Sequence, residues 1–210
     1  MLVTAIEPRR KGLSALYLDG QESLVDTETL AASRLRPGDE LEEEQLLALL
    51  RASDSRRARE KALFILTYRD HSREELKRKL LTASFSEEAA EAAVQKVADM
   101  GLINDREYAR KLARELLFRK RWGERRTVGE MLRRGLEREL IAEVMEEAQP
   151  DPAVQLAEII EKKYTPLPRD EKGQRRMLNA LARMGYGWSD IRSALAQAEK
   201  SMEGWNESDE

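Results

Sequence analysis

Three stretches of fifteen residues decide the fold of this chain. They are LLTASFSEEAAEAAV (Leu80–Val94), MLRRGLERELIAEVM (Met131–Met145) and LARMGYGWSDIRSAL (Leu181–Leu195). Each stretch has apolar residues, or a small alanine, at its first, sixth, eleventh and fifteenth positions, and the sixth positions lie 51 and 50 residues apart. Self-similarity at a fixed period of this length is typical of repeat proteins. The sequence therefore predicts three tandem units of about fifty residues.

A further amphipathic segment precedes the first two stretches at the same distance. Ala62 and Leu66 stand 23 and 19 residues before Phe85, and Ala113 and Leu117 stand 23 and 19 residues before the next anchor. In the third unit, DPAVQLAEIIEKKY supplies this segment and a longer connection follows it. Each unit is thus predicted to contain three helices.

One three-helix unit buries little surface alone, whereas stacked units bury their shared faces. We therefore predict a mainly α fold, with three tandem three-helix repeats in an elongated curved array after a small N-terminal β-containing segment. The expected segments are an N-terminal extension (1–50), repeat 1 (51–103), repeat 2 (104–149), repeat 3 (150–200) and an acidic tail (201–210).

The first fifty residues differ from the rest in pattern. LVTAIEP, LSALYLDG and ESLVD are short, carry alternating or β-branched apolar residues, and predict three strands in a meander. Farther along, Ser72-x-x-Glu75 and Ser84-x-x-Glu87 match capping boxes, and Asp151 before Pro152 predicts another helix start.

Composition excludes several classes of function. The chain has no cysteine and a single histidine, His71, so thiolate zinc sites, cysteine nucleophiles and paired-histidine metal sites are excluded. The sequence lacks a nucleotide-binding glycine loop, its first residues (MLVTAIEPRRKG) lack the long apolar run typical of a signal peptide, and no apolar run approaches a membrane span. We expect a cytoplasmic, monomeric protein that is not an enzyme and that uses no cofactor.

Basic residues are concentrated between residues 119 and 138. Eight positive and three negative residues give this stretch a net charge of +5 in a chain of net −3. Arginine dominates, as suits bidentate pairing with carboxylate or phosphate. The candidate contact residues are Arg119, Lys120, Arg121, Trp122, Arg125, Arg126, Arg133 and Arg134, and the second candidates are Arg9, Arg10 and Lys11.

Two alternatives remain open for this cluster. The charges are either an interaction surface or the solvated face of a helix. Trp122 either packs between repeats or makes an exposed contact.

The helical body resembles the RecX family, the regulatory proteins of the RecA recombinase. The resemblance rests on SREELKRKLLTASFSEEAAEAAVQKVADMGLINDREYAR (Ser72–Arg110), on RWGERRTVGEMLRRGLERELIAEVM (Arg121–Met145) and on the triplication itself. YLDG after a short strand also resembles a small extension of some members. Thr127 and Met131 depart from the family's usual aliphatic residue and leucine, at packing positions.

The resemblance implies a partner and a function. It implies binding to RecA within the groove of its nucleoprotein filament and inhibition of RecA ATP hydrolysis and strand exchange, in DNA recombination, DNA repair and the SOS response. It also implies contact with DNA, weakly or through the filament. An alternative is a regulator that binds DNA independently of RecA through a basic three-helix unit.

Overall fold

The computed structural model describes the backbone of residues 1–206 and the side chains of residues 1–200. The side chains of the expected acidic tail, including Trp205, lie outside this part. The chain divides into two compact units, Met1–Asn104 and the segment from Asp105 onward. Within the described part, no helix is both long enough and apolar enough to cross a bilayer.

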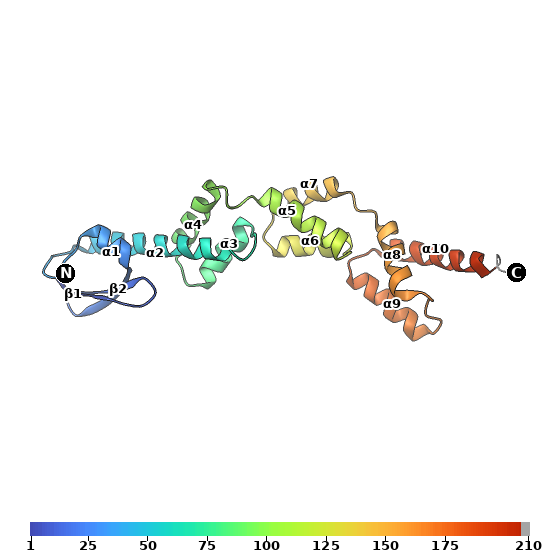
Figure 1. Cartoon of the computed structure of the whole chain (residues 1–210), viewed down its shortest axis with the longest axis horizontal. Coiled ribbons are helices and arrows are strands. Elements are labelled where there is room, and N and C mark those ends of the chain that lie inside the picture. The colour runs from blue at the N-terminus through green and yellow to red at the C-terminus, as the bar shows by residue number, and fades with distance from the viewer. Residues whose placement is uncertain (207–210) are drawn as a thin grey trace. The chain divides into compact units, whose positions relative to one another are not determined.

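A three-stranded antiparallel sheet opens the first unit (Figure 1). Its strands β1 (Val3–Pro8), β2 (Leu13–Leu18) and β3 (Gln21–Asp26) pair in the order β1-β2-β3, which confirms the predicted meander. The short helix α1 (Thr27–Ser33) follows β3 directly, because Asp26 Oδ1 accepts a hydrogen bond from Thr29 N at 2.8 Å. The apolar residues of the sheet pack with those of α1 and the next helix.

The helix α2 (Glu43–Leu66) spans the expected boundary between residues 50 and 51. It runs through these residues without a break, since no glycine or proline interrupts it. Leu49 belongs to the core of the sheet, whereas Ala58 and Ala62 belong to the core of repeat 1. One helix therefore serves both parts of the first unit.

The remaining helices complete three repeats of three helices each, as predicted. They are α3 (Arg73–Thr82) and α4 (Glu87–Asp99) in repeat 1; α5 (Asp105–Arg114) with the π-helical turn η1 (Glu115–Arg119), α6 (Glu124–Arg133) and α7 (Arg138–Ala148) in repeat 2; and α8 (Pro152–Tyr164), α9 (Glu171–Arg183) and α10 (Trp188–Asn206) in repeat 3.

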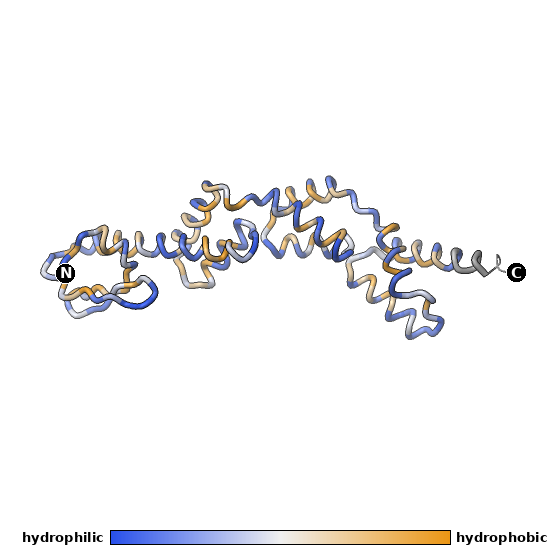
Figure 2. Tube along the Cα trace, viewed as in Figure 1, coloured by the Kyte–Doolittle hydropathy of each residue, from blue (hydrophilic) through white to orange (hydrophobic). Residues whose placement is uncertain are grey.

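Each repeat has its own apolar core. The equivalent residues Leu80, Met131 and Leu181 are all fully buried, and so is Thr127. Leu136 and Tyr186 are 4 % exposed. Figure 2 shows the apolar and polar residues alternating along these helices, as helices with one buried face require. The repeat pattern therefore marks the residues of the cores.

Two serines define the helix starts of repeat 1, one of them as predicted. Ser72 Oγ accepts a hydrogen bond from Glu75 N at 3.0 Å and caps α3. The predicted cap at Ser84 is wrong: Ser84 has a φ of 66° and follows the end of α3, and Ser86 caps α4 instead. The neighbouring His71 is buried, with Nδ1 2.9 Å from Glu75 Oε2. Burial lowers the pKa of His71 despite this carboxylate.

Candidate nucleic-acid and protein interface

The basic segment Arg119–Arg126 lies where repeat 2 meets repeat 3. The segment begins at Arg119, the last residue of η1, and continues into α6, whose N-cap is Gly123. Gly123 N donates a hydrogen bond to the carbonyl oxygen of Met184, at the end of α9, at 2.8 Å. The segment is therefore part of the contact between two repeats of the second unit.

Two glycines bring these repeats into backbone contact. A Cβ atom on Gly123 would lie 2.5 Å from both the carbonyl carbon and the oxygen of Gly185. A Cβ atom on Gly185 would lie 2.6 Å from the backbone nitrogen of Arg126, and Gly185 also has a φ of 97°. No side chain fits at either position unless the backbone shifts.

The phenol of Tyr186 fixes the same contact from inside. Its Oη lies 2.9 Å from the carbonyl oxygen of Arg121 and 2.9 Å from Oε1 of Gln155, and Gln155 is also buried. A hydroxyl has one proton, so it donates to one of these oxygens at a time. A Gln155 amide turned by 180° would donate to the phenol and satisfy both contacts. Burial raises the pKa of Tyr186 to about 12.

This raised pKa predicts a specific loss of stability at high pH. The unfolded tyrosine ionises near pH 10, about two pH units below the folded one, so its contribution is present below pH 10 and is lost as the pH rises to about 12. We expect the wild type to lose on the order of 2–3 kcal/mol relative to Tyr186→Phe across this range.

Urea unfolding of both proteins between pH 8 and pH 12 measures this difference. At pH 8 the variant should be less stable by about 1–2 kcal/mol, because two buried polar groups lose their partner. A constant difference between the two proteins across the range would contradict the assignment.

Most basic side chains of the segment have acidic partners within the chain. Arg119 and Lys120 pair with Glu115 at 2.7 and 3.1 Å, and Arg121 pairs with Glu158. Hydrogen bonds from Lys120 and then Arg119 hold the pKa of Glu115 below its usual range. Their charge is thus partly neutralised before any partner arrives.

Glu130 is a buried acidic neighbour of the basic segment that the pattern of basic residues did not reveal. It is buried on α6, and both Arg133 and Arg134 pair with it. A glutamate three and four residues before two arginines is a helical ion-pair spacing, so this signal was present in the sequence. The pairing leaves Arg133 and Arg134 less charge for an external partner.

Trp122 and Arg126 form a stacked pair at the junction. The Arg126 guanidinium carbon lies 3.7 Å from the centroid of the Trp122 ring, and its Nη1 donates to the carbonyl oxygen of Arg183 at 3.4 Å. Trp122 is half-buried and packs against the core of repeat 2. Part of the Trp122 ring remains accessible, so its role as a contact residue stays a prediction.

Arg125 differs from its neighbours. Its side chain is exposed, and among the described residues it has no ion-pair partner. It lines a cavity of about 240 Å³ together with Gln155, Tyr186 and Asp190. Arg125 therefore keeps its full charge available at the junction.

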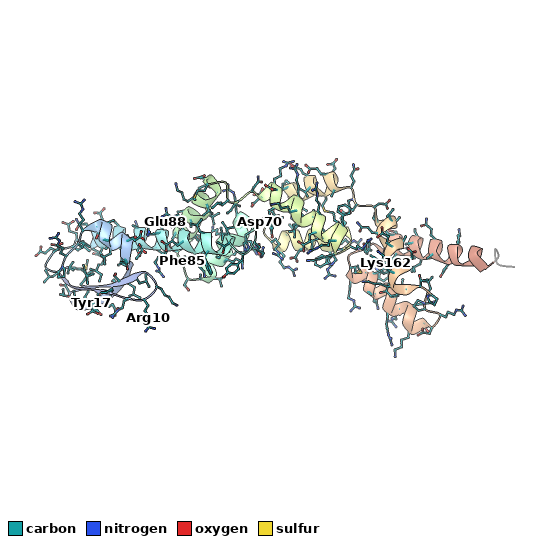
Figure 3. The ribbon with its side chains drawn as sticks, in the orientation of Figure 1. Arg10, Tyr17, Asp70, Phe85, Glu88 and Lys162 are labelled. Atoms are coloured by element: carbon teal, nitrogen blue, oxygen red, sulfur yellow. The ribbon has the colours of Figure 1, made fainter. Side chains whose placement is uncertain are left out.

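The second candidates lie in the other unit, at the β1–β2 turn. Arg9 is engaged there, with Nη2 2.6 Å from Tyr17 Oη and 3.2 Å from Glu7. Arg10 and Lys11 are exposed and lack ion-pair partners among the described residues. Figure 3 shows Arg10 at the free end of this hairpin.

Among the described side chains, no group of three or more histidine, aspartate or glutamate residues is arranged to hold a metal ion. The structure groups cations, carboxylates and the Trp122 indole around the backbone contact between Gly123 and Gly185. The fold and this surface define a protein of tandem three-helix units.

Comparison with known proteins identifies the family. A family model described as RecX, first three-helix domain, matches residues 58–96, and one described as RecX, second three-helix domain, matches residues 104–145. The regulatory protein RecX of Pelodictyon phaeoclathratiforme is 33% identical over 136 residues, which cover 64% of this chain and 84% of that protein. That of Listeria innocua is 27% identical over 217 residues, covering 100% of this chain and 80% of that protein. The chain belongs to the RecX family of regulatory proteins.

Two solved structures share the fold. A crystal structure of regulatory protein RecX has a TM-score of 0.61 and 24% identity, covering 93% of this chain and 98% of its own. The structure of RecX from Lactobacillus salivarius has a TM-score of 0.56 and 19% identity, covering 70% of this chain and 98% of its own. The comparison confirms the mainly helical architecture.

Proposed function

We propose that this chain is a regulator without catalytic activity that binds the RecA recombinase and its nucleoprotein filament. It lowers RecA ATP hydrolysis and strand exchange, and so acts in DNA recombination and repair. Membership in a family of regulatory proteins carries the proposal. The helical repeats support it further, since stacked units offer extended surfaces to a macromolecule rather than a deep pocket to a small substrate.

We propose Arg125 as the contact residue of the basic segment, and the ion pairs of its neighbours support this choice. A partner at Arg119, Lys120 or Arg121 has to compete with an internal carboxylate, whereas a partner at Arg125 does not. Electrostatic contacts at a protein surface are worth most where the charge is not already compensated. Acidic loops of RecA and phosphates of the bound DNA both suit a free guanidinium.

The proposal predicts an effect on RecA filaments. Added at a one-to-one ratio to RecA on single-stranded DNA, the protein should slow ATP hydrolysis. The rate of phosphate release measures this, and an unchanged rate would remove the proposal. Reversal of one charge, Arg125→Glu, should raise the concentration needed for half-inhibition by about tenfold, since 1.4 kcal/mol is a factor of ten in affinity.

Arg51→Glu is the matched control, because Arg51 is an exposed arginine without an ion-pair partner in the described chain and lies in the other unit. Both variants change the net charge equally. Equal losses in both would show that net charge acts rather than Arg125. Reversing Arg126 as well would confuse the test, since Arg126 holds the junction.

A further inference from the structure

The helix α9 carries a stripe of polar residues that the basic segment does not include. Lys172, Arg176, Asn179 and Arg183 follow one another at spacings of four, three and four residues, so they lie on one side of the helix. All four are exposed, whereas Met177 and Leu181 on the opposite side are buried. Arg175, also exposed, lies next to the stripe.

The cations of this stripe have no acidic partners in the described part of the chain. Ion pairs there involve neither Lys172 nor Arg175, Arg176 or Arg183. Residues 162–192 contain eight positive and three negative residues, a net charge of +5, equal to that of the basic segment of repeat 2. One of the three acids, Asp170, is occupied as the cap of α9, where it accepts from Gly173 N.

The corresponding helix of repeat 1 shows the opposite arrangement. On α3, Lys77 pairs with Glu87 at 3.1 Å and with Glu91 at 2.5 Å, and Arg78 pairs with Glu74. These contacts raise the pKa of Lys77. Two cations of the second helix thus have acidic partners within repeat 1, whereas the cations of α9 have none in the described part of the chain.

The repeat frame relates α9 to α6. A step of fifty residues carries Arg125, Arg126 and Arg133 onto three further arginines, Arg175, Arg176 and Arg183. The same step carries the buried Met131 onto the buried Leu181, which fixes the frame. Repeat 1 has Glu74, Glu75 and Thr82 at these positions. The arginines are therefore a property of repeats 2 and 3.

The junction brings the two sets of arginines together. Gly185, two residues after the end of α9, lies against the backbone of Arg126 in the first turn of α6. Arg126 also donates to the carbonyl oxygen of Arg183. The cationic stripe of α9 thus ends beside Arg126, the residue that follows Arg125 in the sequence.

A surface hollow follows the stripe. It has a volume of about 430 Å³ and is lined by Arg176, Asn179, Ala182 and Arg183. Two guanidinium groups and an amide around one depression match the oxygens of a phosphate group. The stripe spans eleven residue steps, or about 16 Å, without an apolar member. Protein interfaces need an apolar centre, so a regularly charged polyanion fits this face better than an acidic protein.

We propose that the exposed face of α9 binds the phosphate backbone of a nucleic acid and continues the surface that Arg125 begins. This inference deepens the proposed function, because it gives the regulator a direct contact with DNA. Binding of DNA by α9 does not require RecA, so this inference and the proposed function can be tested separately.

The test uses the full chain and a fluorescently labelled single-stranded oligonucleotide, with anisotropy measured at several salt concentrations. The variant Arg175→Gln/Arg176→Gln removes two cations. Affinity at low salt should fall about tenfold or more, and the slope of log K against log salt should decrease by about 1.4, since each contact with a single strand contributes about 0.7. Circular dichroism checks that the variant is folded.

The control Lys77→Gln/Arg78→Gln removes the same charge from α3 and should leave the slope unchanged. An α9 variant that binds the oligonucleotide like the wild type, or a wild type that does not bind it, overturns the inference. So does an α9 variant that loses only its inhibition of RecA, since the face would then contact protein. If the wild type binds DNA through α9 and does not slow RecA, the inference holds and the proposed function fails.

Discussion

Gly123→Ala should lower the free energy of unfolding of the second unit by roughly 2–4 kcal/mol. The added Cβ atom meets the carbonyl group of Gly185 at 2.5 Å. Because the obstacle is backbone, no side-chain rotation relieves it. The backbone angles of Gly123, φ −70° and ψ 165°, suit any residue, so the effect is one of contact alone.

Gly129→Ala provides the matched control on the same helix. A Cβ atom there meets nothing within 4 Å, and alanine favours a helix interior by up to about 1 kcal/mol over glycine. Urea unfolding should show opposite signs for the two variants. Amide hydrogen exchange in α6 and α9 should rise in Gly123→Ala. Equal stability of the two variants would mean that the close contact is not present in solution.

Leu80→Ala has the second large effect, in repeat 1. Leu80 is fully buried at the position that Met131 and Leu181 occupy in the other repeats. Removing its side chain should cost about 3 kcal/mol, within the range of 2–5 kcal/mol for buried leucines.

Its neighbour Leu81, on the same helix, is 39% exposed and serves as the control. Leu81→Ala should cost less than about 1 kcal/mol. Hydrogen exchange of the α3 and α4 amides reports both variants. A similar loss of protection in both would refute the repeat frame.

The sequence predicted the residues of the cores well because apolar periodicity reflects burial directly. Leu80, Met131 and Leu181 were all identified in this way. Helix boundaries were harder: Ser84 has a glutamate at capping-box spacing and Ser86 does not, yet Ser84 has a left-handed backbone and Ser86 caps α4. The expected boundary at residue 50 falls within α2, whose buried residues join the core of the sheet at Leu49 and the core of repeat 1 from Ala58 onward.

The sequence located the candidate site, but it could not show which of its basic residues are paired within the chain. Charge density identified the basic segment, yet the availability of each charge depends on partners that are distant in sequence. Arg121 pairs with Glu158, and Arg126 reaches Arg183. Such contacts depend on how one repeat packs on the next. The apolar periodicity of the sequence carries no information about that packing. Arg125 is recognised as an unpaired cation only after the partners of its neighbours are known.

The continuous helix α2 gives the first unit a mechanical property. Its 24 residues extend about 36 Å, from the core of the sheet to the core of repeat 1, and no loop between them can absorb a rotation. Ser53 on α2 accepts a hydrogen bond from Asp26 N at 2.8 Å, at the end of β3, so the strand is tied to the helix. A force applied at the Arg10 hairpin should therefore rotate the sheet and α2 together as one rigid body. The rotation would reach α3 and α4, which pack against the other end of α2.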